Sequence, residues 1–313
     1  MSLIEQAAKR LEELRLAGVA IPEAATPPGP PPPELLPSEA VAATPPAPAR
    51  HPRSDEVAAP LPATGDSGPS RRVELDLAAL SASGIIRPDA PRSQVADEYR
   101  VIKRPLIANA MGKGAAPIAN GNLIMVTSAL PGEGKSFTAA NLAMSIAMEL
   151  DNTVMLVDAD VSRPSLLRMM GLPPAPGLLD ILVDESIDLR QVLLRTNVEK
   201  LSILPSGTQH ARATELLASD AMARLLEDMA SRYSDRIIIF DSPPLLVTTE
   251  ARVLASHMGQ VVVVVKAEGT AQGDVKHALA AIEGCPVKLM LLNQAKSGPQ
   301  GSYGYGYGYG YGS

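Results

Sequence analysis

Residues Leu123–Ser136 read LIMVTSALPGEGKS, and this stretch decides the fold of the chain. Its first five residues, 123–127, are apolar or β-branched and predict a buried strand. A glycine-rich loop follows, and residues 136–150 then carry apolar side chains at helical spacing, among them Leu142 and Ile146. A strand, a glycine-rich loop and a helix in this order are the structural context of a phosphate-binding loop.

The loop supplies the groups that a nucleoside triphosphate with Mg²⁺ requires. Its glycines let consecutive backbone N–H groups turn toward phosphate oxygens, Lys135 can reach the β- and γ-oxygens, and the Ser136 hydroxyl suits Mg²⁺. Ala129 stands where the usual pattern has its first glycine, a small departure. We therefore expect ATP and Mg²⁺ as cofactors. The predicted nucleotide-binding residues of the loop are Pro131, Gly132, Glu133, Gly134, Lys135, Ser136 and Phe137.

Carboxylates follow two further predicted strands. Asp158 and Asp160 come directly after residues 153–157, and Asp241 follows residues 237–240. Paired aspartates at a strand end are otherwise helix caps, but beside a phosphate-binding loop one can hold Mg²⁺ and its waters while the other accepts a proton. The sequence leaves open which of the pair is the base. The predicted catalytic residues are Lys135, Asp158 and Asp160, and the predicted metal ligands are Ser136, Asp160 and Asp241.

Apolar runs alternate with helical patterns between Asn122 and Asn293. The predicted strands are residues 123–127, 153–157, 201–204, 237–240, 261–265 and 287–292, and the predicted helices include 221–229 and 275–282. Strands that are apolar on both faces and alternate with helices indicate an α/β fold with a doubly wound, mostly parallel sheet. Ligands of such sheets bind outside the carboxyl ends of the strands, where the aspartates fall.

Composition divides the chain into an amphipathic helix, a disordered Pro-rich linker, a folded P-loop domain and a Tyr/Gly-rich tail, at residues 1–18, 19–72, 73–295 and 296–313. The linker holds many of the 29 prolines and has no hydrophobic period, so it cannot bury a core. Lead-in helices are expected over residues 73–110, and we expect the helix that contains Asp97 to end at Pro105.

Charge and cysteine content narrow the function classes. The net charge of -6 argues against nucleic-acid binding, which needs clustered lysine and arginine on the protein surface. We expect Lys103 and Arg104 to lie at a solvated helix end. Cys285 is the only cysteine, so an intrachain disulfide is excluded and a small core residue in a reducing compartment is expected. No stretch reaches the apolar length of a membrane helix, which predicts a cytoplasmic protein.

These motifs together resemble those of the bacterial tyrosine kinases of polysaccharide export. The resemblance rests on residues 131–136, on Asp158-Ala159-Asp160 with Arg163-Pro164, and on Asp241-Ser242-Pro243-Pro244. It implies a P-loop NTPase fold of the partition-ATPase-like type. Partition ATPases themselves carry a second lysine near the start of the loop, where this chain has Ala129 and Leu130. Residues 4–12, 204–207 and 214–217, with the Pro-rich linker, look closest to the exosortase-associated members.

The resemblance implies an ATP-dependent protein-tyrosine autokinase that regulates exopolysaccharide synthesis and export. In this family a C-terminal tyrosine cluster is the phosphoacceptor, which here corresponds to Tyr303, Tyr305, Tyr307, Tyr309 and Tyr311. Implied partners are the cytoplasmic segment of a membrane chain-length-determinant protein as activator, a cognate tyrosine phosphatase, and other copies of the chain, in a ring or a transient dimer, for phosphorylation in trans. The activator would recruit the chain to the inner face of the membrane.

Three points stay open at this stage. Family members dock on a neighbouring subunit with a charged helix, and the match to it here is in charge alone, at Asp97, Arg100 and Lys103. Asn293 either reads the edge of adenine, as an asparagine at this place does in related ATPases, or is a turn residue. The alternative function is a partition-type switch ATPase that positions or scaffolds a membrane assembly.

Overall fold

The computed structural model describes residues 70–89, 93–232 and 235–296. The chain divides into two units, Met1–Pro62 and Ala63–Ser313, and every described residue belongs to the second. The predicted N-terminal helix, nearly all of the predicted linker and the tail from residue 297 lie outside the described residues, as do the five tail tyrosines. Their boundaries stay predictions.

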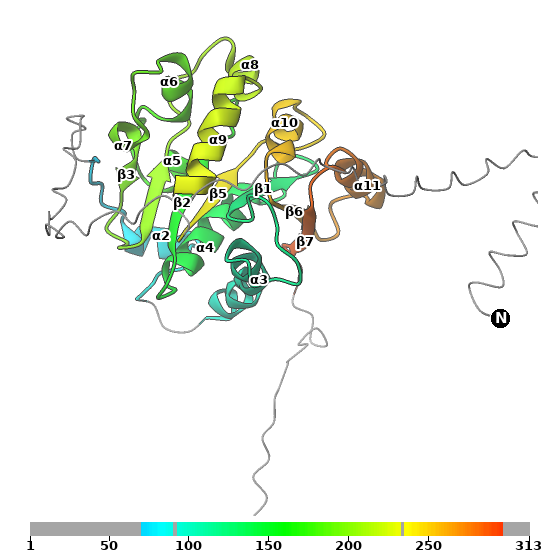
Figure 1. Cartoon of the computed structure of the whole chain (residues 1–313). Coiled ribbons are helices and arrows are strands. Elements are labelled where there is room, and N and C mark those ends of the chain that lie inside the picture. Colours follow the sequence, from blue (N-terminus) through cyan, green and yellow to red (C-terminus); the bar gives the residue numbers. More distant parts are fainter. Residues whose placement is uncertain (1–69, 90–92, 233–234, 297–313) are drawn as a thin grey trace, which may run out of the picture. The chain divides into compact units, whose positions relative to one another are not determined.

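A mostly parallel sheet forms the centre of the described region (Figure 1). Its strands are β1 (Leu123–Ser128), β2 (Thr153–Asp158), β3 (Leu194–Arg195), β4 (Leu201–Leu204), β5 (Arg236–Asp241), β6 (Gln260–Lys266) and β7 (Val287–Asn293). Their spatial order is β3-β4-β2-β5-β1-β6-β7, and all neighbours pair in parallel except β3 and β4. The predicted α/β class and the six predicted strands are confirmed; β3 was not predicted.

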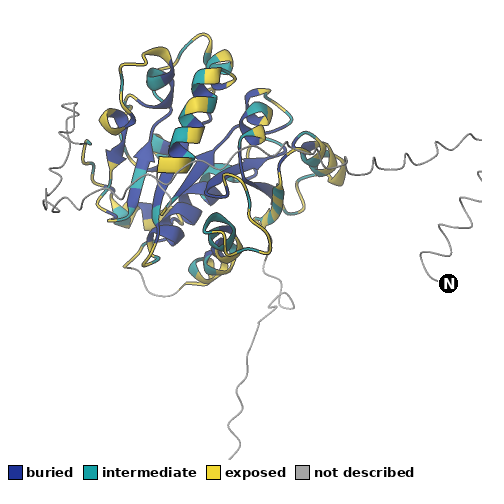
Figure 2. Ribbon diagram, in the orientation of Figure 1, coloured by how far each residue is buried: buried dark blue, intermediate teal, exposed yellow. Residues whose placement is uncertain are grey.

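Helices cover both faces of this sheet and give it two hydrophobic cores (Figure 2). One layer contains α2 (Leu77–Ala82), α3 (Gln94–Ala110), α4 (Lys135–Ala147) and α5 (Leu166–Met169). The other contains α6 (Leu178–Val183), α7 (Leu189–Val192), α8 (Ala213–Leu217), α9 (Asp220–Arg232), α10 (Glu250–Ser256) and α11 (Gln272–Ala280). This is the doubly wound arrangement that the sequence predicts.

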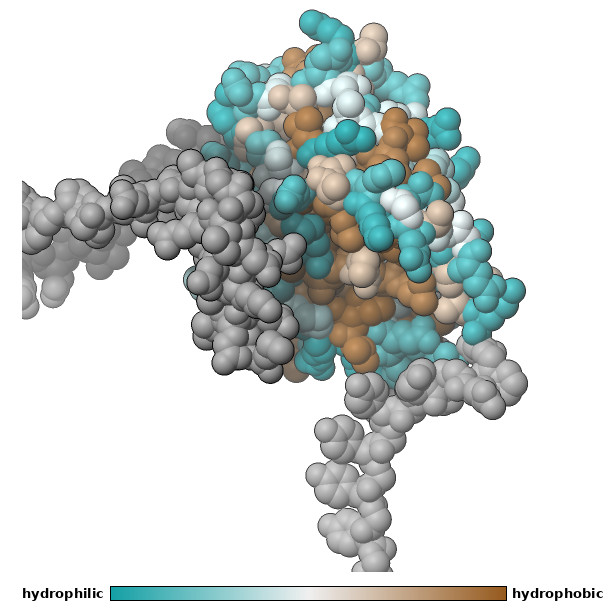
Figure 3. All heavy atoms as spheres, turned by 90° about the vertical axis from the view of Figure 1, so that its right-hand side faces the viewer, coloured by the Kyte–Doolittle hydropathy of each residue, from teal (hydrophilic) through white to brown (hydrophobic). Residues whose placement is uncertain are grey.

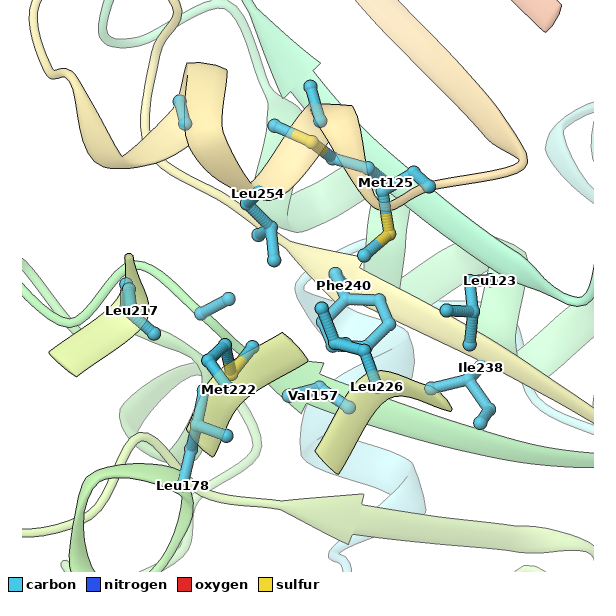
Figure 4. Packing of buried hydrophobic residues seen from close by; sticks show 14 of the residues in the cluster. Leu123, Met125, Val157, Leu178, Leu217, Met222, Leu226, Ile238, Phe240 and Leu254 are labelled. Atoms are coloured by element: carbon cyan, nitrogen blue, oxygen red, sulfur yellow. The ribbon is translucent and has the colours of Figure 1, made fainter. Parts of the chain in front are cut away.

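Alternation along β5 divides its side chains between the two cores. Ile237 and Ile239 belong to the core under α3 and α4, whereas Ile238 and Phe240 belong to the core under α9 and α10. Figure 4 shows Phe240 facing α9 in the second core. A strand that is buried on both faces is held firmly, which fixes the position of the carboxylate at its end, Asp241.

Helix α3 departs from the sequence prediction in two ways. It does not end at Pro105 but continues to Ala110, because Leu106 is buried in the core. Proline has no N–H for the carbonyl one turn earlier in the helix, but Pro105 is exposed, so water can reach that carbonyl. Lys103, predicted to be solvated, is only 4% exposed. Its Nζ donates to the Ser145 carbonyl at 2.5 Å and pairs with Glu149 at 2.7 Å.

Strand β7 forms the edge of the sheet that lies farthest from β3. Met290 and Leu292 alternate along β7 and are 64% and 65% exposed, and apolar side chains gather on this face of the molecule (Figure 3).

Cys285, just before β7, is buried as predicted. Each helix in the described part of the chain is too short or too polar to cross a membrane.

Candidate active site

The parallel strands bring the predicted carboxylates to one edge of the sheet. Asp158 at the end of β2 pairs in register with Asp241 at the end of β5, and the N–H of Ala159 donates to the Asp241 carbonyl at 2.8 Å. The phosphate-binding loop leaves the neighbouring strand β1 at the same edge. Residues far apart in the sequence therefore meet at the place that the strand order predicts.

Two glycines shape the loop between β1 and α4. Gly132 and Gly134 have positive φ values of 82° and 96°, a region that other residues rarely adopt. A Cβ at Gly134 would also lie 2.1 Å from Nδ2 of Asn293, so the Asn293 side chain would have to move to admit it. The backbone conformation thus requires glycine at this position, where α4 begins.

The buried side chain of Glu133 braces this loop from within. Its Oε2 accepts a hydrogen bond from the Leu130 N–H at 2.7 Å, and its Oε1 accepts one from the Thr270 hydroxyl. Asn293 Nδ2 donates to the Glu133 carbonyl at 2.9 Å. The loop is therefore tied to the segment after β6 and to the end of β7, and Asn293 lies against it.

Lys135 and Asp160 form the charged wall of a small cavity. Lys135 Nζ lies 2.8 Å from Asp160 Oδ2, and Asp160 Oδ1 accepts the Arg163 N–H at 3.1 Å. The cavity, of about 290 Å³, is also lined by Pro131 and Gly132. Ser136 is near, since Lys135 Nζ donates to its hydroxyl at 3.4 Å. The cavity thus joins loop backbone, a cation and a carboxylate.

The side chain of Phe137 packs into the hydrophobic core. Its ring packs with the core under α3 and α4, and it lies against Gly84, where a Cβ would be 3.3 Å from the ring. The side chain is not among the residues that line the small cavity, so the structure places it in the helix layer.

Asp158 and Asp241 are buried carboxylates, and three of their four oxygens lack a hydrogen-bond partner among the described residues. Leu166 N–H donates to Asp158 Oδ2 at 3.1 Å, but Asp158 Oδ1 and both oxygens of Asp241 have no hydrogen-bond partner among the described residues. Burial, followed by the nearby charge of Asp241, raises the pKa of Asp158 from 3.8 to about 7.

The pKa of Asp241 is also raised by burial, but two neighbouring residues act to lower it. Burial raises its pKa to about 6, while the charge of Lys135 and then the Ser136 hydroxyl lower it. The Ser136 hydroxyl lies near the Asp241 carboxyl but makes no hydrogen bond to either of its oxygens. Buried carboxylate oxygens without donors are costly unless a ligand satisfies them.

This arrangement fits Mg²⁺ with a nucleotide. Mg²⁺ prefers oxygen ligands and in phosphate-binding sites keeps several waters while it binds one or two carboxylates and the phosphates. The unpaired oxygens of Asp241 and the Ser136 hydroxyl are such ligands, and they lie beside Lys135 and the loop backbone. The donor set therefore suits the metal, and its assignment to individual residues is taken up as a proposal below.

The family model described as an AAA domain matches residues 121–289. The tyrosine-protein kinase YwqD of Bacillus subtilis (strain 168) is 31% identical over 222 residues, which are 70% of this chain and 90% of YwqD. The chain belongs to the bacterial tyrosine-protein kinases. Both the P-loop fold and the predicted family are thus confirmed.

Two other proteins extend the comparison for this kinase. The succinoglycan biosynthesis transport protein ExoP of Rhizobium meliloti (strain 1021) is 35% identical over 170 residues, which are 53% of this chain and only 20% of ExoP. The crystal structure of the chimerical protein CapA2B2 has 27% sequence identity and a TM-score of 0.56, and the match covers 71% of this chain and 93% of that one.

Some residues of the kinase site carried no signal in the sequence. Thr270 contacts Glu133 across 137 positions, and Ser165, whose hydroxyl donates to Ser136 Oγ at 3.3 Å, stands in a turn just before α5. Neither belongs to a motif, so only the folded structure brings them to the loop. Arg163, which lines the small cavity, was noted only as part of the family pattern.

Proposed function

We propose that this chain is an ATP-dependent tyrosine autokinase whose acceptors are Tyr303, Tyr305, Tyr307, Tyr309 and Tyr311. The observation that carries the proposal is a pair of buried carboxylates beside a phosphate-binding loop, with three of their four oxygens unpaired among the described residues. A second supports it: Asn293 contacts the loop, so the tail that follows residue 296 begins close to the nucleotide site.

Each residue of the loop edge has a part in this reaction. Backbone N–H groups of residues 132–136 and the ammonium of Lys135 hold the phosphates, for which Lys135 turns from Asp160 toward the anion. Ser136 and Asp241 would hold Mg²⁺, and Asp160 beside them would orient a water. The metal, when bound, neutralises charge that develops on the phosphoryl oxygens.

Asp158 is the proposed proton acceptor. The phenol oxygen forms a bond to the γ-phosphorus as the bond to the ADP oxygen breaks, and the phenol proton passes to Asp158 Oδ1, which has no other partner. A carboxyl pKa near 7 is a closer match to a phenol, with its pKa of about 10, than an ordinary carboxyl would be. We therefore favour Asp158 over Asp160 as the proton acceptor, because Asp158 has this raised pKa and a buried oxygen without a partner.

Regulation through a membrane protein is the next part of the proposal. The similar ExoP is named for succinoglycan biosynthesis and transport, which supports a role in exopolysaccharide synthesis and export for this chain. We propose a cytoplasmic kinase, recruited to the inner face of the membrane by the cytoplasmic segment of a chain-length-determinant protein that activates it. Other copies of the chain serve as partners for phosphorylation in trans, and a tyrosine phosphatase reverses the modification.

Intact mass after incubation with MgATP tests the autokinase. The full chain, with and without the activator segment, should gain one to five phosphates, and a chain ending at Gln300 should gain none. Lys135→Met in the full chain should abolish the mass steps. ATP hydrolysis without any mass step, with and without the activator, would instead favour the switch ATPase, although that class carries a second lysine where this chain has Ala129 and Leu130.

A further inference from the structure

Strand β7 has a free edge. It pairs with β6 on one side, and among the described residues no strand lies on its other side. The carbonyl of Asn293 accepts the N–H of Ala267 at 2.9 Å, so the backbone groups of Asn293 point toward β6. Because successive residues of a strand alternate, the backbone groups of Lys288, Met290 and Leu292 point away from β6. These groups can pair with a further strand.

The two faces of β7 differ in how they are covered. Leu289 and Leu291 pack against the core under α3 and α4. Alternation places Met290 and Leu292 on the opposite face, where each is about two-thirds exposed (Figure 3). An exposed apolar row beside an unpaired strand edge is a feature that proteins ordinarily cover, because it invites pairing. A covering segment is therefore expected at β7.

The single charged residue of β7 does not protect this edge. Lys288 is that residue, and its ammonium donates to the carbonyls of Glu283 and Cys285 at 2.9 Å and 2.8 Å. Both carbonyls belong to the turn before the strand. A lysine on a strand edge deters pairing when it extends over that edge, but this one is held toward the start of β7. The half of the edge with Met290 and Leu292 stays open to a partner strand.

The sequence that follows β7 contains a segment with the period of a strand. Residues 302–313 read SYGYGYGYGYGS, with tyrosine at every second position. When extended, this segment places all its rings on one face and only glycine on the other, and the rings repeat every 7 Å or so, as Met290 and Leu292 do. Tyrosine favours strands, whereas glycine disfavours them, so the segment needs a partner strand to become ordered. It carries no charge that would oppose pairing.

We propose that residues 302–313 of the same chain add to the sheet as an antiparallel strand on the free edge of β7, with their tyrosine rings over Met290 and Leu292. The backbone groups of the segment pair with those that point away from β6. Rings on the sulfur of Met290 and on Leu292 form cross-strand contacts of a favourable kind. The glycine face lies toward α3, where it adds no side chain to a core that is already filled.

The course of the chain after β7 supports this occupant. Gln294 has a φ of 58°, so the chain leaves the direction of the strand directly after Asn293. Residues 294–302 then connect β7 to Tyr303, and they include Gly298-Pro299 and Gly301, which are typical of turns. An antiparallel strand that begins near Tyr303 runs back along β7, which is about 23 Å long. The segment 302–313 is longer than β7 and covers it.

The docked segment would hold the acceptor tyrosines in reserve, a role that rests on the proposed autokinase. A ring that lies on Met290 is not at the phosphate-binding loop, so only the undocked segment can be phosphorylated. Each phosphate then adds roughly -1.5 to -2 charges. A strand would hold these charges on one face beside apolar side chains, where they repel one another and lose water. Phosphorylation therefore releases the segment and exposes the edge of β7.

Amide hydrogen exchange, resolved at single residues by NMR, tests the docking without phosphotransfer. The full chain, treated with a tyrosine phosphatase and free of nucleotide, is compared with a full chain in which all five tail tyrosines are changed to serine. The amides of Lys288, Met290 and Leu292 should exchange about tenfold more slowly in the parent. The amides of Leu289 and Leu291, which point toward β6, are the internal control and should exchange equally in both chains.

The exchange rates decide between occupants of the edge. Equal rates at the three edge amides in both chains would overturn the inference. Edge protection that survives the loss of the rings and increases with protein concentration would assign the edge to a second copy, which would overturn it as well. The parent with a fully phosphorylated tail should exchange at the edge like the serine variant.

A charge on the apolar row tests the reserve role. Met290→Glu in the full chain should abolish the edge protection and raise the initial rate of tail phosphorylation by the same factor, about tenfold, because more of the segment is free. Val183→Glu is the matched control, since Val183 is an exposed apolar residue at the end of α6, and it should change neither quantity. An unchanged rate in Met290→Glu would overturn the reserve role. If the parent gains no phosphate from MgATP, the proposed function fails, and the exchange rates still decide the docking.

Discussion

Two regions of this molecule that contain buried charge have opposite local chemistry. Between α3 and α4, Lys103 has a side chain 5% exposed and donates to both the Ser145 carbonyl and Glu149. At the ends of β2 and β5, Asp158 and Asp241 are as deeply buried, yet three of their four carboxylate oxygens have no partner among the described residues. The first region satisfies its charge within the protein, and the second does not.

This difference separates a structural charge from a binding site. Taking a charge out of water is costly, and hydrogen bonds to the charged group are what offset that cost. A lysine with two acceptors can therefore stabilise the packing of α3 on α4. Carboxylates without donors destabilise the fold until a cation or a proton arrives, which is a reason to expect function there.

Replacement at the unsatisfied site should have the largest effect. Asp158→Asn keeps an oxygen for the Leu166 N–H but removes the proposed proton acceptor, so the initial rate of tail phosphorylation should fall about 10²- to 10⁴-fold. Intact mass against time measures it, with MgADP titration alongside. Asp160→Asn provides the contrast, since its loss of the Lys135 pair should change nucleotide binding. If Asp160→Asn loses turnover only and Asp158→Asn loses binding, the two roles are exchanged.

The two regions should also respond to pH with opposite sign. The folded-state pKa of Asp158 is raised from 3.8 to about 7, so the folded state binds more protons than the unfolded state between these values. Stability without nucleotide should fall as pH rises from about 4 to about 7, by on the order of 4 kcal/mol from this group. Asp241, raised to about 6, adds in the same direction.

Glu149 should give the free energy of unfolding the opposite dependence on pH. Its pKa is lowered from 4.5, chiefly by the hydrogen bond from Lys103, so its contribution is present above that value and is lost as pH falls below it. Urea unfolding at several pH values checks both. Asp158→Asn should flatten the rise toward acid between pH 7 and pH 4, and an unchanged profile in that variant would show that Asp158 is not the source.

Breaking the satisfied region should affect stability and leave chemistry alone. Lys103→Met keeps the aliphatic packing but leaves the Ser145 carbonyl without its donor, which should cost about 1–3 kcal/mol and lower the Tm by several degrees. MgADP affinity should not change. Arg100→Met on the same helix is the control, because its pair with Asp97 is exposed and should be worth less than about 1 kcal/mol. Equal Tm values for both variants would remove the contrast between them.

Sequence reasoning reached the sheet and the position of the carboxylates for a physical reason. Strands such as β1 and β5 are apolar on both faces, and a parallel sheet brings their ends together, so Asp158 and Asp241 were predicted to meet. The apolar pattern and the rule for the carboxyl ends of open α/β sheets were sufficient there. The P-loop itself is a contiguous motif and needed no tertiary information.

What the sequence did not reveal depends on contacts between distant segments. A two-residue strand such as β3 is too short to show a period, and the buried state of Lys103 depends on a carbonyl 42 positions away. The clamp of Thr270 on Glu133 has the same origin. A larger cavity beside Asp158 was also missed, because its walls come from α5 and from residues 172–176 and 206–209, whose approach no local pattern encodes.

The smallest expected effect concerns Asn293, a satisfied polar contact inside the functional region. Its amide donates to the Glu133 carbonyl, so Asn293→Ala should loosen the loop and cost about 1 kcal/mol, or roughly fivefold in affinity, for MgADP and MgGDP alike. Lys296→Ala, which removes only an exposed pair with Glu268, should leave both affinities unchanged. Loss confined to MgADP would mean that Asn293 reads the adenine edge. Equal loss of affinity for both nucleotides would mean that Asn293, like Lys103, is a polar group whose partner lies within the protein. Its effect on the ligand would then come only from holding the loop.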